Sequence, residues 1–115
     1  MKAGVKKRKL VDYLIGVMHQ LELDKGRRLS YTDFAEMVDL PIKTVTSMFD
    51  PVYARLPNRT NAERVAIAVG SNEIMEILGY RPVDPLIIET QKVYRTLSRE
   101  QKKKVLTYMR SLTKE

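Results

Sequence analysis

Two short helical patterns lie almost end to end in "SYTDFAEMVDLPIKTVTSMFD", residues 30–50. This spacing restricts the possible folds more than any other feature of the chain. Ser30, with an acid three residues later, is typical of a helix N-terminus, and Pro41 is typical of the first turn of a second helix. Neither helix is long enough to be stable alone. The segment therefore predicts two helices that cross steeply and are held in place by other helices.

Close packing of these two helices requires particular types of residue at a few positions. A small residue, Ala35, stands where the helices approach each other. The apolar residues that would lock the pair are Phe34, Leu40, Val45 and Met48. The turn needs a residue that tolerates a left-handed backbone, and Asp39 stands there. These assignments leave an outer face on the second helix that carries Ile42, Lys43, Thr46 and Ser47.

Hydrophobic periodicity in the rest of the chain predicts five further helices and no strand. They lie at about residues 9–22, 61–70, 71–78, 85–96 and 98–112. The last two would form a hairpin with wide apolar faces, lined by Leu86, Thr90, Val93, Tyr94, Leu97, Val105, Met109 and Leu112. This hairpin would either pack onto the first helix or pair between subunits. We therefore expect an all-α protein.

Composition excludes several classes of protein. The 115 residues fit one small domain, and 43% hydrophobic residues suffice for a core. The chain has no cysteine, which rules out disulfides, thiolate zinc sites and cysteine nucleophiles and fits a cytoplasmic location. No apolar run approaches the length of a membrane span. Its single histidine, His19, has no nearby metal-ligand partners, and no glycine-rich phosphate loop is present. We expect neither an enzyme nor a bound cofactor, metal or small-molecule substrate.

The formal net charge of +7 favours a polyanionic partner. The charge is unevenly distributed along the chain. Residues 1–28 hold eight basic residues against three acidic ones, and residues 80–115 hold nine against four, whereas residues 29–79 hold four against seven. Any nucleic-acid interface in the middle segment must therefore present its few cations on one face.

Residues 29–78 resemble the lambda-repressor-like, Xre-type helix-turn-helix family. The resemblance rests on "LSYTDFAEMVDLPIKTVTSMFD", on the loop and helix "PNRTNAERVAIAVG", and on the short helix "NEIMEILG". It implies a basic N-terminal arm at 1–8, a five-helix DNA-binding domain at 9–80, and a C-terminal helical extension at 81–115 that serves as a possible dimerisation element. Two residues depart from the family pattern. Asp39 replaces the usual turn glycine, and Ile42 stands where a polar base-reading residue is common.

The resemblance also implies roles for individual residues. Tyr31 would bond a phosphate, Ile42 would meet a thymine methyl, and Lys43 would pair with guanine. Other base-facing residues would be Thr46 and Ser47. The loop that grips the DNA backbone would use Arg55, Asn58, Arg59 and Asn61. The arm that reaches around the duplex would use Lys6, Lys7, Arg8 and Lys9.

These observations predict a sequence-specific regulator of transcription that binds double-stranded DNA. We expect a repressor that acts by occupying an operator, as a homodimer on two half-sites. Three alternatives remain open. They are an antitoxin that binds a toxin partner as well as its own operator, a sequence-indifferent nucleoid-type protein, and an adaptor that binds only other proteins.

Overall fold

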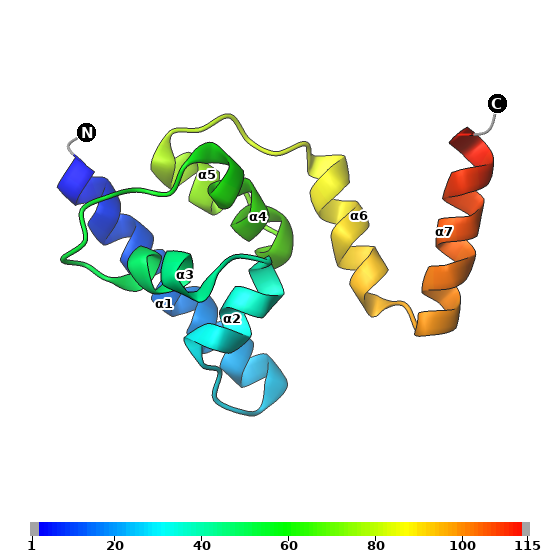
Figure 1. Cartoon of the computed structure of the whole chain (residues 1–115), viewed down its shortest axis with the longest axis horizontal. Helices are drawn as coiled ribbons and strands as arrows, with labels where there is room; N and C mark the ends of the chain where they lie inside the picture. The colour runs from blue at the N-terminus through cyan, green and yellow to red at the C-terminus, as the bar shows by residue number, and fades with distance from the viewer. Residues whose placement is uncertain (1–2, 114–115) are drawn as a thin grey trace.

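The computed structural model of the protein describes residues 3–113, and these contain seven helices and no strand. The expectation of an all-α protein is therefore confirmed (Figure 1). The helices are α1 (Ala3–Lys25), α2 (Tyr31–Val38), α3 (Ile42–Phe49), α4 (Arg59–Val69), α5 (Glu73–Leu78), α6 (Pro85–Thr96) and α7 (Arg99–Thr113).

One hydrophobic core joins α1 to α5. Helix α1 packs against α3 and α5, α2 packs against α3 and α4, and α4 packs against α5. Each of these helices contributes an apolar stripe, so their buried side chains meet in one continuous cluster. Side chains with almost no exposed surface include Leu10, Leu14, Phe34, Val45, Val65 and Ile74. The two short helices α2 and α3 are thus held by two longer helices, α1 on α3 and α4 on α2, as their length requires.

The turn between α2 and α3 matches the expectation from the sequence. Ser30 caps α2, since its hydroxyl accepts from the Asp33 amide while the Asp33 carboxylate accepts from the Ser30 amide. Asp39 adopts the left-handed conformation, with φ 56° and ψ 49°. Arg64 of α4 donates to the Asp39 carbonyl at 2.6 Å and to its carboxylate at 3.1 Å. The guanidinium therefore fixes the turn from which α3 starts.

Helix α1 begins six residues earlier than the sequence pattern indicates. The expectation of a free basic arm before this helix is wrong for residues 3–8, which are helical; residues 1 and 2 lie outside the described range. The Lys7 ammonium is buried and donates to the Ser47 carbonyl at 2.6 Å. The Lys6 ammonium donates to the Leu78 carbonyl at 3.4 Å. Cations at helix C-termini are favourable, so Lys6 and Lys7 stabilise the ends of α5 and α3.

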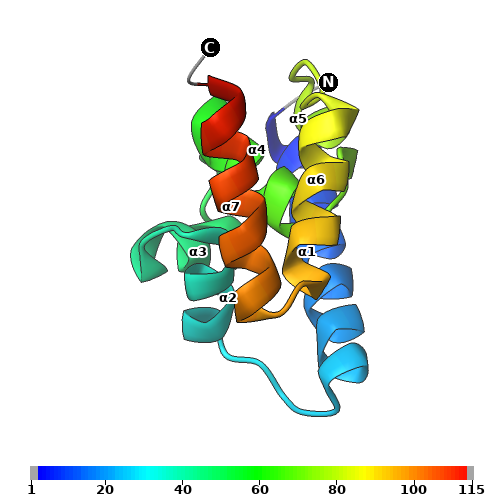
Figure 2. The same ribbon diagram turned by 90° about the vertical axis from the view of Figure 1, so that its right-hand side faces the viewer.

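The C-terminal hairpin lies at one side of the molecule. Helix α6 packs on α4 through Ile88, its only buried side chain, and helix α7 buries none of its side chains within residues 3–113. The apolar stripe predicted for α6 faces away from this contact, because Leu86 is 74% exposed and Val93 53%. Figures 1 and 2 show α6 and α7 as an antiparallel pair, with α7 the element farthest from α1.

Candidate nucleic-acid interface

Helix α3 has one buried and one open face. Val45, Met48 and Phe49 enter the core, since their spacing places them on one side of the helix. The opposite side carries Ile42, which is 42% exposed, together with Lys43, Thr46 and Ser47. Lys43 and Thr46 are exposed, whereas Ser47 is half-buried. The open face therefore holds one cation, one apolar side chain and two hydroxyls.

Both hydroxyls of this face are oriented by the helix itself. The Thr46 Oγ1 donates to the Lys43 carbonyl at 3.1 Å, and the Ser47 Oγ donates to the same carbonyl at 2.8 Å. Because each hydroxyl uses its only hydrogen in this way, its oxygen is left as an acceptor. In this arrangement the two side chains suit a donor such as an exocyclic amino group.

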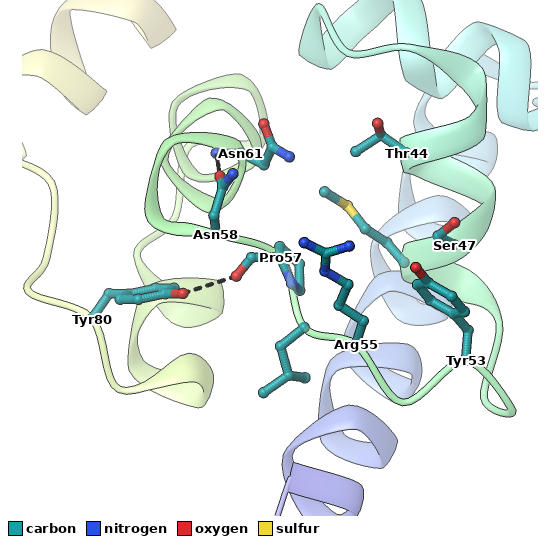
Figure 3. Close-up of a pocket in the computed structure, with 10 residues that line it drawn as sticks. Thr44, Ser47, Tyr53, Arg55, Pro57, Asn58, Asn61 and Tyr80 are labelled. Carbon is teal, nitrogen blue, oxygen red and sulfur yellow. Dashed lines mark hydrogen bonds between the residues drawn. The ribbon is translucent and has the colours of Figure 1, made fainter.

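A cleft of about 420 Å³ lies between α3 and the loop that leads to α4. Its walls bring together four of the predicted site residues: Ser47, Arg55, Asn58 and Asn61. The other lining residues are Thr44, Met48, Tyr53, Leu56, Pro57 and Tyr80. Figure 3 shows the Arg55 side chain lying between the α3 wall and the wall formed by Asn58 and Asn61. The cleft is thus polar and carries a cation.

The loop wall of the cleft is fixed by two hydrogen bonds. Asn58 is the N-cap of α4, and its side-chain oxygen accepts from the Asn61 amide at 2.9 Å. The Tyr80 hydroxyl donates to the Pro57 carbonyl at 2.9 Å (Figure 3). Helix α4 consequently starts at Arg59, two residues before the position that the sequence pattern indicates. An Asn58 that caps a helix has less freedom to reach a ligand than the free loop residue we expected.

Arg59 is not a free cation. Its Nε lies 2.7 Å from the Glu63 carboxylate, one turn later on α4. Pairs of this kind on an exposed helix are weak, so a phosphate could displace the carboxylate. Until it does so, the positive charge beside the cleft comes mainly from Arg55.

Tyr31 packs against the C-terminal end of α3. Its ring lies 4.8 Å from the Phe49 ring, which in turn meets the Phe34 ring edge-on at 5.6 Å. Tyr31 is nonetheless 46% exposed. The Asp33 carboxylate lies at the same helix N-terminus, and its hydrogen bond from the Ser30 amide lowers the pKa of that carboxyl. A phosphate here would meet a carboxylate, which weakens the role predicted for Tyr31.

Lys7 lies behind the open face of α3 and its cleft, and its side chain is not part of that surface. It is 2% exposed, and its ammonium lies 5.9 Å from the centre of the Tyr53 ring. Burial lowers the pKa of Lys7, and the nearby Asp50 carboxylate partly opposes that shift. Arg8 and Lys9 are exposed on α1. The run of four cations therefore divides into two that support helix ends and two on the surface.

Among the six lining residues outside the predicted set, three carry hydroxyl groups that sequence reasoning missed: Thr44, Tyr53 and Tyr80. Thr44 lies one helical turn before Ser47, and this spacing of three could have placed it on the same wall. Tyr53 covers the buried Lys7, which no local signal indicates. Tyr80 holds the loop from 23 residues away, a distance over which periodicity carries no information.

Within residues 3–113, no group of three or more potential metal ligands comes together, and no helix has the length and hydropathy needed to cross a membrane. Comparisons with protein-family models, curated proteins and solved structures gave no match to this chain.

Proposed function

We propose that the protein is a sequence-specific, double-stranded DNA-binding regulator of transcription, with α2 and α3 as a lambda-repressor-like helix-turn-helix. The observation that supports this most is the position of the open face of α3 beside a polar cleft that holds Arg55. An interface of this form separates two tasks. Side chains of α3 reach base edges, while the loop contacts the phosphate backbone.

The dimensions of α3 suit the major groove. A helix of eight residues is roughly 12 Å long, similar to the groove width. Ile42 and Lys43 lie in its first turn, the part of a recognition helix that meets the bases. Lys43 pairs with guanine acceptors and Ile42 packs on a thymine methyl, while the acceptor oxygens of Thr46 and Ser47 take an amino group.

The proposed mode of action is repression. One subunit offers few base contacts, so selectivity requires two subunits on half-sites about one DNA turn apart. A homodimer that occupies its operator excludes other proteins from it, and this requires no catalytic group. A toxin or another protein partner is the second candidate, favoured by the exposed apolar side chains of α6 and α7.

The experiment that tests the proposal is selection from a pool of random DNA duplexes at about 0.15 M salt, where non-specific binding is weak. Enrichment of an inverted repeat supports a dimeric regulator and supplies its operator. Retention of DNA without enrichment contradicts sequence-specific binding and indicates a nucleoid-type protein. No retention contradicts DNA binding altogether and indicates a protein partner.

A further inference from the structure

The part of the chain that carries the open face of α3 is short of free cations. Residues 29–79 hold four basic side chains against seven acidic ones. Two of the four, Arg59 and Arg64, form ion pairs with carboxylates, so Lys43 and Arg55 are left for a phosphate backbone. Neutralisation of several phosphates supplies much of the affinity of a protein for duplex DNA. A DNA-binding protein built on this surface therefore needs cations from another part of the chain.

The α6–α7 hairpin carries such cations. Residues 85–113 hold seven basic side chains against two acidic ones. The ion pairs of the described residues use Arg27, Arg59 and Arg64, and none of these pairs includes a cation of the hairpin. The hairpin therefore holds a surplus of positive charge that no carboxylate of the described chain neutralises by direct contact.

Three of these cations form one row along α7. Arg99, Lys103 and Arg110 are spaced by four and seven residues, which places them on the same face of the helix. All three residues are exposed, and together they are the cationic row of α7. The row is roughly 16 Å long, which corresponds to about five nucleotides of one strand of a duplex. It is therefore long enough to meet several phosphates at once.

The contact between α7 and α6 turns the cationic row outward. Lys102 and Val105 are half-buried, and the Lys102 ammonium lies 5.2 Å from the centre of the Tyr94 ring, so this side of α7 faces α6. The cationic row lies roughly a third of a turn away from this side. Figure 2 shows α7 displaced from α6 toward the side of the molecule on which α2 and α3 lie. The row is thus accessible on the outer surface of the hairpin.

We propose that the cationic row of α7 is a second phosphate-binding surface, which contacts the backbone of duplex DNA outside the segment that α3 reads. The inference rests on the proposed function and assigns to α7 the phosphate contacts that residues 29–79 lack. Figure 1 shows α3 and α7 well apart along the longest axis of the molecule, which measures 49 Å. The backbone contacts of one chain then extend beyond its half-site.

The separation of charged and apolar faces on α7 favours a duplex over a bilayer. Val105, Met109 and Leu112 follow a helical period and form an apolar stripe, roughly 130° around the helix from the cationic row. A helix on a bilayer buries its apolar face among the lipids. With the stripe inserted in this way, the cationic row would point toward water. A phosphate backbone, in contrast, requires the cations alone.

The test is binding of the full chain to a duplex of about 40 base pairs and mixed sequence, titrated by fluorescence anisotropy between about 0.05 and 0.2 M salt. Phosphate contacts are independent of sequence, so no operator is needed. Lys103→Gln combined with Arg110→Gln should reduce the slope of log K against log salt by about two units. At about 0.1 M salt this corresponds to binding that is roughly 50-fold weaker.

The matched control is Lys102→Gln combined with Lys104→Gln. It removes the same charge from the other faces of α7, so the salt slope should stay within about half a unit of the wild type. Far-ultraviolet circular dichroism checks that both variants keep their helix, since Gln and Lys have similar helix propensities. Equal losses of affinity in the two double variants would make net charge the cause and would overturn the proposal.

The remaining outcomes separate this proposal from the proposed function. If the Lys103→Gln, Arg110→Gln variant keeps the wild-type slope while Arg55→Ala lowers it, the second surface is overturned and the proposed function stands. If the wild type does not bind the duplex even at about 0.05 M salt, both are overturned. Flotation of the chain with vesicles of anionic lipid would then assign the cations of α7 to a membrane surface.

Discussion

Asp39 is the one residue outside glycine with a left-handed backbone in residues 3–113, with φ 56°. A side chain in this region costs about 1–2 kcal/mol, and the cost is lower for Asp than for most residues because it bonds locally. Here the Arg64 guanidinium adds a contact to both the carbonyl and the carboxylate of Asp39. The turn thus tolerates a residue other than glycine.

The effect of substitutions at Asp39 should depend on the strain of its left-handed backbone and on its contacts with Arg64. Asp39→Gly removes the strain and the exposed carboxylate contact while raising the entropy of the unfolded chain, so the free energy of unfolding should change by less than about 0.5 kcal/mol. Asp39→Val should lower it by about 1–2 kcal/mol, because a branched side chain fits this conformation poorly. Urea unfolding of both variants checks the prediction. Equal losses would show that the carboxylate, and not the backbone, governs the turn.

The Asp33 carboxylate makes the capping box depend on pH. Its pKa is lowered from the ordinary 3.8 by the hydrogen bond from the Ser30 amide. The folded state therefore favours the ionised form. The resulting stabilisation is complete above pH 3.8 and is lost as the pH falls through the lower pKa of the folded state.

Asp33→Asn should consequently be less stable than the wild type at pH 7, and the difference should shrink in acid. Urea midpoints at pH 7 and at about pH 2.5, below the ordinary range of carboxyl pKa values, measure both effects. Glu36→Gln, another exposed carboxylate of α2, serves as the control and should show little change. If wild type and Asp33→Asn differed by the same amount at both pH values, the Asp33 carboxylate would not be the source of the pH dependence.

At the scale of elements, the proposed function assigns base contacts to α3 and phosphate contacts to the loop between α3 and α4, and substitutions can test this assignment. Lys43→Ala should change the preferred base at one position of each half-site. Arg55→Ala should instead weaken binding to all duplexes about equally and reduce the salt slope by about one unit. Binding to a panel of single-base operator variants distinguishes these results. If both variants lost affinity with no change in preference, α3 would not be the reading helix.

The ion pair on α4 yields a second prediction of this kind. Arg59 lies 2.7 Å from Glu63, so any phosphate contact by Arg59 competes with that carboxylate. Glu63→Gln should therefore strengthen binding to all duplexes by a few fold and steepen the salt dependence. Glu76→Gln on α5 makes the same change in net charge away from the cleft. If Glu76→Gln strengthened DNA binding as much as Glu63→Gln does, the change in net charge, and not the release of Arg59, would be the cause.

Helix ends with local signals were predictable from sequence. The capping boxes at Ser30 with Asp33 and at Ser98 with Gln101 are both present. The start of α1 was not predictable, because the partners of Lys6 and Lys7 are carbonyls 72 and 40 residues away along the chain. The side of α6 that packs on the core could not be predicted either, because apolar residues lie on two sides of this helix and the sequence does not show which side is buried. Within the candidate site, the residues near α3 followed from spacing, whereas Tyr80 did not.

At the scale of the molecule, α7 extends beyond the core that α1 to α5 form. Because α7 buries no side chain within residues 3–113, it should open without unfolding that core, and its amide hydrogens should exchange fast in the free protein. If α7 binds phosphates as proposed, an excess of duplex DNA should slow this exchange by about tenfold or more, because a ligand stabilises the state that it binds. Hydrogen exchange followed by mass spectrometry measures this, with peptides from α4 as the slowly exchanging reference. Exchange in α7 that duplex DNA leaves unchanged would contradict it.

The anchoring of α3 has a consequence for how such a protein can change over time. Lys7 holds one end of the helix through the carbonyl of Ser47, and Arg64 holds the preceding turn through the carbonyl of Asp39. Both contacts use main-chain atoms, which every amino acid provides. The side chains on the open face are therefore free to be exchanged without loss of either anchor. Under the proposed DNA-binding function, single substitutions in α3 can therefore create new target preferences, while the two anchors of the helix stay unchanged.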